Sequence, residues 1–133
     1  MLAGSFLRKR EIVLDAELLE NGVERARILV HELFHFVWLR LGNLDRQSWS
    51  ELLEAEHVAR ARGELGWSSE WRKCEAREGR LWREYACESF CDTAAWIYAQ
   101  IGDHKEFTLA PRWRRKRRVW FEERIDTRKS VRL

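Results

Sequence analysis

A run of apolar residues, ILVHELFHFVWLRLG from Ile28 to Gly42, contains three titratable side chains near its middle. His31 and His35 are four residues apart, and Glu32 follows the first histidine. Residues four apart project from the same face of a helix, so both imidazoles can reach one ion. Buried histidines beside an acid are unfavourable unless each has a partner, and a metal ion supplies one. The run therefore predicts a rigid helix over about 23–41 that carries metal ligands.

The spacing is H-E-x-x-H, in which two histidines bind zinc and the glutamate takes a proton from a metal-activated water. The alternative from the residues alone is a pair of core histidines bonded to backbone or water, with Glu32 at a partly exposed edge. A catalytic zinc ion needs a third protein ligand and an open position for water. A third histidine six residues after His35 is excluded, because that position is Leu41.

The best candidate for the third ligand lies in ACESFCDTAAW, from Ala86 to Trp96. Glu88 and Asp92 are four apart on an expected helix, among small residues that favour close packing. We predict that Glu88 binds the metal and that Asp92 accepts a hydrogen bond from the second nitrogen of a ligand histidine. The alternative is a solvated stripe, since Glu84, Glu88 and Asp92 recur every four residues.

Helix-forming residues dominate the chain, and it has only one proline and seven glycines among 133 residues. The segment Arg10–Leu19 is the best strand candidate. Three further helices are expected within 45–66, 67–79 and 80–102. Ser48 and Glu51 have the spacing of a capping box for the first of these helices. We predict an α+β fold that is mostly helical, with a small sheet from the N-terminal segment and possibly from the C-terminal one. Its domain would span residues 1–110.

The three cysteines are Cys74, Cys87 and Cys91, an odd number without the spacing of a disulfide framework. Cys87 and Cys91 are expected to be small buried residues, or alternatively a metal pair with Cys74 or His57. The first ten residues are too short and too charged for a signal peptide, and no apolar run is long enough to span a membrane. These features predict a cytoplasmic protein.

Positive charge is concentrated after Pro111, where the sequence has ten Lys and Arg residues but only three Asp and Glu residues. We expect residues 111–133 to form a basic tail. Five consecutive basic residues, Arg114–Arg118, are flanked by Trp113 and Trp120. This composition suits phosphate contact and base stacking through the segment Arg112–Arg118. The partner would be nucleic acid or an acidic protein; a membrane surface and a solvated tail are the alternatives. The eight tryptophans are expected to fill the core or to line an apolar cleft.

The two motifs together, HELFH and then ESFCD, resemble the gluzincin metallopeptidases, whose signature is H-E-x-x-H followed by E-x-x-x-D. The segment REIVLDAELLENGVERARILVHELFH is similar in layout to the small intracellular ImmA/IrrE-type peptidases. The resemblance implies a zincin-like domain in which His31, His35 and Glu88 bind Zn2+ and Glu32 is the general base. This class also stabilises its transition state with a His or Tyr, and His104, beside Asp103, is the nearest candidate. Tyr85 and Tyr98 are alternatives.

The sequence thus predicts a zinc-dependent metallopeptidase that hydrolyses peptide bonds in a peptide or protein substrate. The alternative is a module without catalysis, with a structural metal or none, that binds nucleic acid or an acidic partner through its basic tail.

Overall fold

The computed structural model describes residues 3–6, 11–14, 22–76 and 78–126. These residues form two strands and five helices. In chain order the elements are β1 (Ala3–Phe6), β2 (Glu11–Leu14), α2 (Gly22–Arg40), α3 (Asn43–Val58), α4 (Trp67–Lys73), α5 (Gly79–Tyr98) and α6 (Pro111–Arg124).

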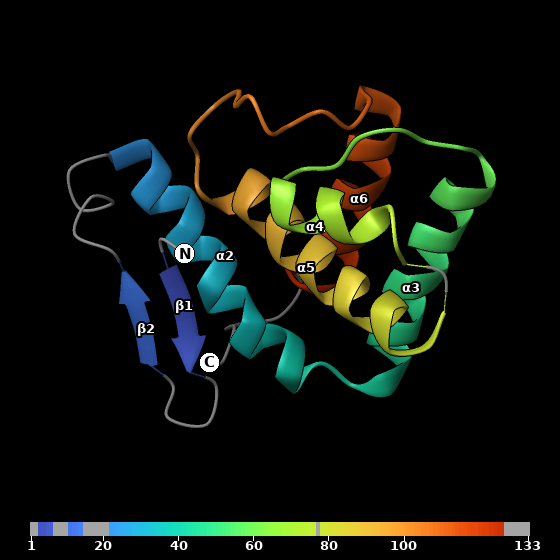
Figure 1. Cartoon of the computed structure of the whole chain (residues 1–133), viewed down its shortest axis with the longest axis horizontal. Coiled ribbons are helices and arrows are strands. Elements are labelled where there is room, and N and C mark those ends of the chain that lie inside the picture. Colours follow the sequence, from blue (N-terminus) through green and yellow to red (C-terminus); the bar gives the residue numbers. More distant parts are fainter. Residues whose placement is uncertain (1–2, 7–10, 15–21, 77, 127–133) are drawn as a thin grey trace.

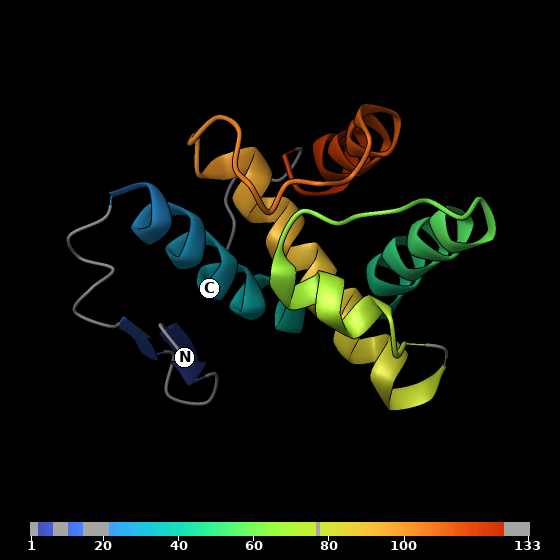
Figure 2. The ribbon, with the colours of Figure 1, turned by 45° about the horizontal axis from the view of Figure 1, so that its top comes forward.

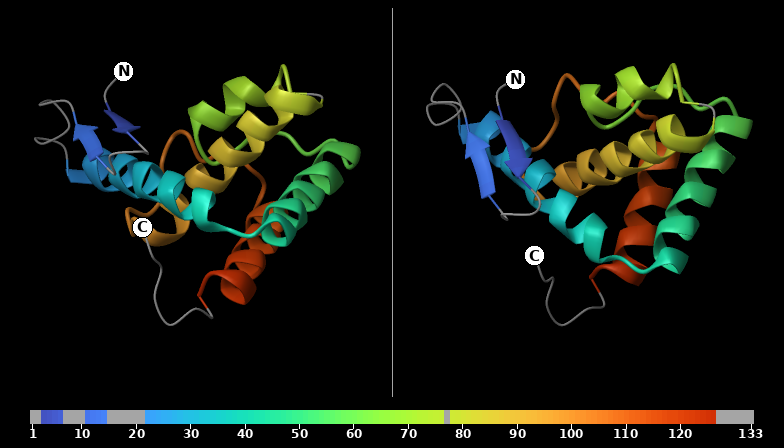
Figure 3. Two further views of the ribbon diagram at one scale, coloured as in Figure 1. Left: turned by 90° about the horizontal axis from the view of Figure 1, so that it is seen from below. Right: turned by 60° about the horizontal axis from the view of Figure 1, so that its bottom comes forward.

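Helix α5 lies at the centre of the helices, with α2, α3 and α4 packed against it (Figures 1 and 3). Every residue from Ser89 to Ala95 in α5 is buried. A helix that is buried on all sides needs other elements packed around it. Most side chains in this run are small, so the neighbouring helices can approach α5 closely. The long contact between α2 and α5 brings together the two helices that carry the predicted ligands.

The main core forms where aromatic side chains of α3, α5 and α6 meet. Phe90 is fully buried and contacts Trp49, Trp120 and Phe121, with ring centroids 5.9, 6.0 and 5.0 Å away respectively. Such offset and edge-to-face pairs contribute beyond the area they bury. A smaller cluster of Leu65, Phe107, Leu109 and Trp113 packs the loops after α3 and α5 against the start of α6.

The prediction of an α+β fold with a small sheet is wrong. Within residues 22–126 the described chain forms helices and loops only, so the body of the molecule is all-helical. The strands β1 and β2 are four residues each and pair as an antiparallel hairpin beside α2, away from α3 and α6 (Figure 2). A hairpin of this size is not a sheet layer. The strand expected over Arg10–Leu19 is described only at 11–14; residue 10 and residues 15–19 lie outside the described residues.

The segment expected to be a basic tail begins instead with a helix of the core. Pro111 is at the first turn of α6, where its fixed φ favours a helix start. Trp113, Arg117, Trp120 and Phe121 are buried at helical spacing. In the sequence these buried residues alternate with Lys and Arg, so the segment has the composition of an exposed basic tail and its buried stripe is not predicted. Residues 127–133 lie outside the described residues.

The expected capping box of the second helix is also wrong. α3 begins at Asn43, which places Ser48 inside the helix, and no side chain caps its first turn. The Ser48 hydroxyl instead accepts a hydrogen bond from the Trp120 indole at 3.1 Å. Ser48, which the local sequence predicts to cap a helix, therefore makes a tertiary contact with α6 instead.

Candidate metal centre

The predicted ligands from α2 and α5 converge on one point. The Glu88 Oε2 atom lies 2.9 Å from His31 Nε2 and 3.6 Å from His35 Nε2. Zinc–ligand bonds of about 2.0–2.2 Å place two ligand atoms of a tetrahedral site roughly 3.4 Å apart. Side chains four apart on α2 thus face a carboxylate on α5 at distances close to those of a coordinated ion.

The Ser68 hydroxyl donates a hydrogen bond to Glu88 Oε2 at 2.9 Å, so α4 helps to orient this carboxylate. Glu32 is buried next to the histidines, and ligand atoms of His31, Glu32 and His35 lie within 4.8 Å of one another. Among the described residues, the Glu32 carboxylate has no hydrogen-bond partner. It is therefore available to a bound water or ligand.

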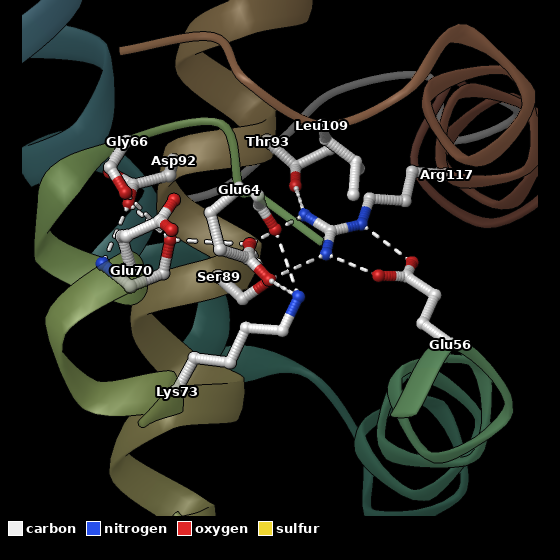
Figure 4. A network of polar contacts seen from close by, with 12 residues as sticks. Glu56, Glu64, Gly66, Glu70, Lys73, Ser89, Asp92, Thr93, Leu109 and Arg117 are labelled. Atoms are coloured by element: carbon white, nitrogen blue, oxygen red, sulfur yellow. Dashed lines mark hydrogen bonds and ion pairs between the residues drawn. The ribbon is translucent and has the colours of Figure 1, made fainter. Parts of the chain in front are cut away.

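Asp92 is hydrogen-bonded to His31 on the side of the ring that faces away from Glu88. Its Oδ1 atom lies 2.7 Å from His31 Nδ1, so the imidazole donates there and its Nε2 atom faces Glu88. Its Oδ2 atom accepts hydrogen bonds from the Ser69 backbone amide at 3.0 Å and hydroxyl at 2.7 Å, and so caps α4. Figure 4 shows Asp92 beside Gly66. A Cβ atom at Gly66 would lie 2.3 Å from the Asp92 carboxyl carbon, so this approach requires glycine.

The electrostatics of the site favour positive charge. Burial alone would lower the pKa of His31, but the Asp92 and Glu88 carboxylates outweigh it and raise this pKa to about 10. For His35, burial is outweighed by hydrogen bonds with Cys87 and Glu88, which raise its pKa to about 9. Burial would raise the pKa of Glu88, but the two histidines hold it well below its usual range. Two imidazoles and a carboxylate that converge in such a site are a donor set that fits zinc.

The site opens into a cavity of about 610 Å3. One wall is α4, with Trp67, Trp71 and Arg72, and another is the N-terminal half of α2 with Arg27 and Ile28. Trp71 is 71% exposed and Trp67 42% exposed, although both are large apolar side chains. Exposed tryptophans at the mouth of a cavity are typical of a binding surface for an apolar group. Tryptophan is thus found both in the core and along the cavity.

His104 does not join this arrangement. It packs instead against the start of α2, where its Nε2 atom bonds to Glu24, and its Nδ1 atom accepts a hydrogen bond from the Glu106 backbone amide at 3.1 Å. Glu24 is seven residues before His31, about two helical turns away. Both ring nitrogens are occupied, so the geometry does not support His104 as a group that contacts the reacting atoms.

Tyr85 and Tyr98 also do not contact the site. The Tyr85 hydroxyl donates to the buried Glu64, and the Tyr98 hydroxyl bonds to Asp126. Within the described chain, no residue predicted to stabilise the transition state therefore reaches the cavity.

A buried network of charges supports the site, and sequence reasoning missed it. Arg117 of α6 is fully buried and donates to Glu56 at 2.7 and 2.8 Å and to Glu64 at 2.9 and 3.0 Å (Figure 4). The Ser69 hydroxyl, which donates to Asp92, lies 3.3 Å from Glu64 Oε1. A contiguous set of polar contacts thus runs from α6 to His31. Its only sequence signal is the spacing of Arg117 on the buried stripe of α6.

Cys87 and Cys91 lie beside His35. The expectation of small buried residues holds for Cys91, which is buried, and in part for Cys87, which is half-buried. The alternative, a metal pair with Cys74 or His57, is not formed among the described residues. The Cys87 Sγ atom lies 3.6 Å from His35 Nδ1 instead, and ligand atoms of His35, Cys87 and Cys91 lie within 4.8 Å of one another. A hydrogen bond from the Cys91 thiol, opposed by burial and aided by His35, lowers the pKa of Cys87 to about 6.

Comparisons of the chain with known protein families, curated proteins and solved structures found no match. In the described part of the chain, no helix is both long enough and apolar enough to cross a membrane.

Proposed function

We propose that the chain is a zinc-dependent metallopeptidase of gluzincin type, with His31, His35 and Glu88 as the zinc ligands. The observation that carries the proposal is the convergence of these three side chains from α2 and α5. The Glu32 carboxylate, which has no hydrogen-bond partner among the described residues, lines the same cavity. Zinc, when bound, would supply a Lewis acid that polarises the scissile carbonyl and acidifies a water molecule.

The roles of the chain's own groups follow from their positions. Glu32 takes the proton of the attacking water and delivers it to the leaving amine. Asp92 fixes the tautomer and ring orientation of His31, and Ser68 orients Glu88. The exposed faces of Trp67 and Trp71 receive an apolar side chain of the peptide. The three cysteines are free in the structure, which favours a reducing, cytoplasmic setting for this enzyme.

The test is a comparison of zinc content and hydrolysis in untagged protein and its Glu32→Gln variant. We expect one zinc per chain by elemental analysis in both proteins. Hydrolysis of casein and of fluorescence-quenched peptides should fall by about 10²–10⁴-fold in the variant, because only the proton transfer is removed. Glu54→Gln, an exposed change of the same chemistry on α3, should leave both properties unchanged.

Two results would reject the proposal. Absence of zinc from protein purified without chelators would reject the proposed zinc site. Equal hydrolysis by the parent and Glu32→Gln would reject Glu32 as the general base.

A second candidate function is binding of nucleic acid through the outer face of α6. Arg112, Arg115, Lys116 and Arg118, here called the cationic face, are exposed, and none has a carboxylate partner among the described residues. The stacking expected of Trp113 and Trp120 is wrong, because both are buried. Phosphate contact is the interaction that remains, and this candidate would operate without sequence specificity.

The cationic face can be tested without deleting any of α6. Substitution of its four residues by Gln should weaken binding to single-stranded DNA and flatten the salt dependence, since each neutralised phosphate of a single strand contributes about −0.7 to the slope of log K against log salt. Gln at the exposed Arg60, Arg62, Arg80 and Arg83 is the charge-matched control. Equal losses in the two variants would mean that net charge, rather than this face, binds the DNA.

A further inference from the structure

His35 faces two different sets of metal-binding atoms with its two ring nitrogens. Nε2 points to Glu88, at 3.6 Å, whereas Nδ1 points to the Cys87 sulfur, also at 3.6 Å. In a tetrahedral site, metal–sulfur and metal–nitrogen bonds of about 2.3 and 2.0–2.1 Å separate the two ligand atoms by roughly 3.6 Å. The Cys87–His35 pair therefore already has the spacing of two ligands of one ion.

Cys91 supplies the third donor. It is one helical turn after Cys87 on α5, so the two sulfurs lie on one face of the helix. The ligand atoms of His35, Cys87 and Cys91 all lie within 4.8 Å of one another, and Cys91 is fully buried. Two thiols and an imidazole in apolar surroundings select soft cations over Mg2+ or Ca2+.

We propose that Cys87, Cys91 and His35 form a second metal site, for a thiophilic cation such as Cd2+ or Cu+, and that it competes with the zinc ligands for His35. The cation binds thiolates and a neutral imidazole nitrogen, so any proton held by Cys87, Cys91 or the Nδ1 atom of His35 is released to solvent on binding. The competition follows from the chemistry of histidine, because a neutral imidazole has one nitrogen with a free lone pair. A cation held at Nδ1 takes that lone pair and leaves Nε2 protonated, so zinc loses a ligand.

The existence of the site and its competition with zinc are separate claims. The first rests on the sulfur and nitrogen positions alone. The second rests on the proposed zinc centre, and it predicts that a thiophilic cation would inhibit the peptidase by displacing zinc from His35.

Titration of the metal-free, reduced chain with Cd2+ tests the site. We expect one tightly bound Cd2+ with sulfur-to-cadmium charge-transfer absorption. Cys87→Ser or Cys91→Ala should weaken Cd2+ binding by at least about a hundredfold, because loss even of an outer-shell partner lowers metal affinity 10–100-fold. Cys74→Ser, at an exposed cysteine directly after α4, is the matched control and should bind as the parent does.

Cys87 is only partly buried, so the Cys87→Ser variant keeps the test valid if Cys91→Ala unfolds. Parent protein without the charge-transfer absorption, or a Cys87→Ser variant that retains it at full strength, would overturn the proposal.

Glu88→Gln separates the two sites. It removes a zinc ligand and no sulfur ligand, so the variant should still bind one Cd2+ with the sulfur-to-cadmium charge-transfer absorption of the parent. Loss of Cd2+ binding in Glu88→Gln would show a single mixed site and overturn the proposal.

The competition is measured on zinc-loaded protein. One equivalent of Cd2+ should release zinc to a chromophoric indicator in the parent and in Cys74→Ser, but not in Cys87→Ser. Simultaneous binding of both ions without release would overturn the competition and leave the second site in place. A chain that binds Cd2+ through sulfur but never binds zinc would refute the proposed peptidase and not the thiol site.

Discussion

At the scale of single residues, Asp92 joins three elements with one carboxylate. One oxygen bonds to His31 of α2, and the other accepts two hydrogen bonds from Ser69 at the start of α4, while Asp92 itself belongs to α5. The orientation of the first histidine thus depends on how α4 and α5 pack. A carboxylate is required, because both oxygens act only as acceptors.

Asp92→Asn should therefore weaken zinc binding by about 10–100-fold, the effect typical of a lost partner behind a ligand histidine. The amide presents a donor where a carboxylate oxygen accepted, so either His31 or Ser69 loses its acceptor. Zinc affinity is measured by competition with a chelator of known strength. Asp103→Asn, at an exposed loop position, is the control. Unchanged affinity in Asp92→Asn would mean that this contact does not orient His31.

Gly66 is the second residue on which the site depends. Its φ is extended, so the requirement for glycine is space and not backbone freedom. Gly66→Ala should destabilise the fold by about 1–3 kcal/mol, as overpacking does, and should weaken zinc binding, because the new methyl group displaces the Asp92 carboxylate. Gly42→Ala is a matched control, since a Cβ atom there meets nothing within 4 Å. Urea denaturation and zinc competition measure the two effects; equal stability of both variants would contradict the argument.

The residues that sequence reasoning found and missed differ in one respect. His31, His35, Glu88 and Asp92 each lie on a helix at a four-residue spacing, and such a spacing is visible in one segment of the chain. Gly66 and Glu64 act through contacts with residues more than twenty positions away. No local pattern marks a glycine whose missing side chain makes room for a carboxylate.

At the scale of elements, α6 shows how tertiary contact decides the role of a charged segment. Its buried residues recur at spacings of three and four, which is the pattern of an amphipathic helix. Arg117 occupies one of these positions. A cation in a run of cations indicates a solvated surface, so the sequence pattern does not predict a buried stripe here. The burial becomes favourable only through Glu56 and Glu64, which come from other segments.

Arg117→Met should destabilise the protein by about 3–5 kcal/mol, because it leaves Glu56 and Glu64 buried without their shared partner. Arg115→Met removes the same charge from an exposed position of the same helix and should change stability by no more than about 0.5 kcal/mol. The free energy of unfolding is measured in urea. Similar values for the two variants would show that the buried ion pairs are replaceable by apolar packing.

At the scale of the whole molecule, the packing of α6 and the metal site are parts of one arrangement. Glu64 lies between them: it binds Arg117 on one side and is 3.3 Å from the Ser69 hydroxyl on the other, and Ser69 in turn holds Asp92. A change that neutralises Glu64 should therefore reach both the core and His31. Acid is such a change, and it requires no substitution.

Burial by itself would raise the pKa of Glu64, but Arg117 and Lys73 outweigh it, and the pKa lies below the ordinary value of 4.5. A carboxyl group whose pKa is lower in the folded than in the unfolded state stabilises the fold above its unfolded pKa, and this stabilisation is lost as the pH falls through the folded pKa. The free energy of unfolding of the metal-free chain, measured in urea at each pH, should thus decrease as the pH falls below 4.5.

Glu64→Gln identifies the group responsible for this acid dependence. The variant should be less stable than the parent at neutral pH, because Arg117 loses a charged partner, but its stability should fall less steeply below pH 4.5. Glu54→Gln, at an exposed position, should retain the parent's steepness. An equally steep acid limb in Glu64→Gln and the parent would assign the effect to other carboxyl groups, and it would separate the acid sensitivity of the fold from the contacts that lead to Asp92.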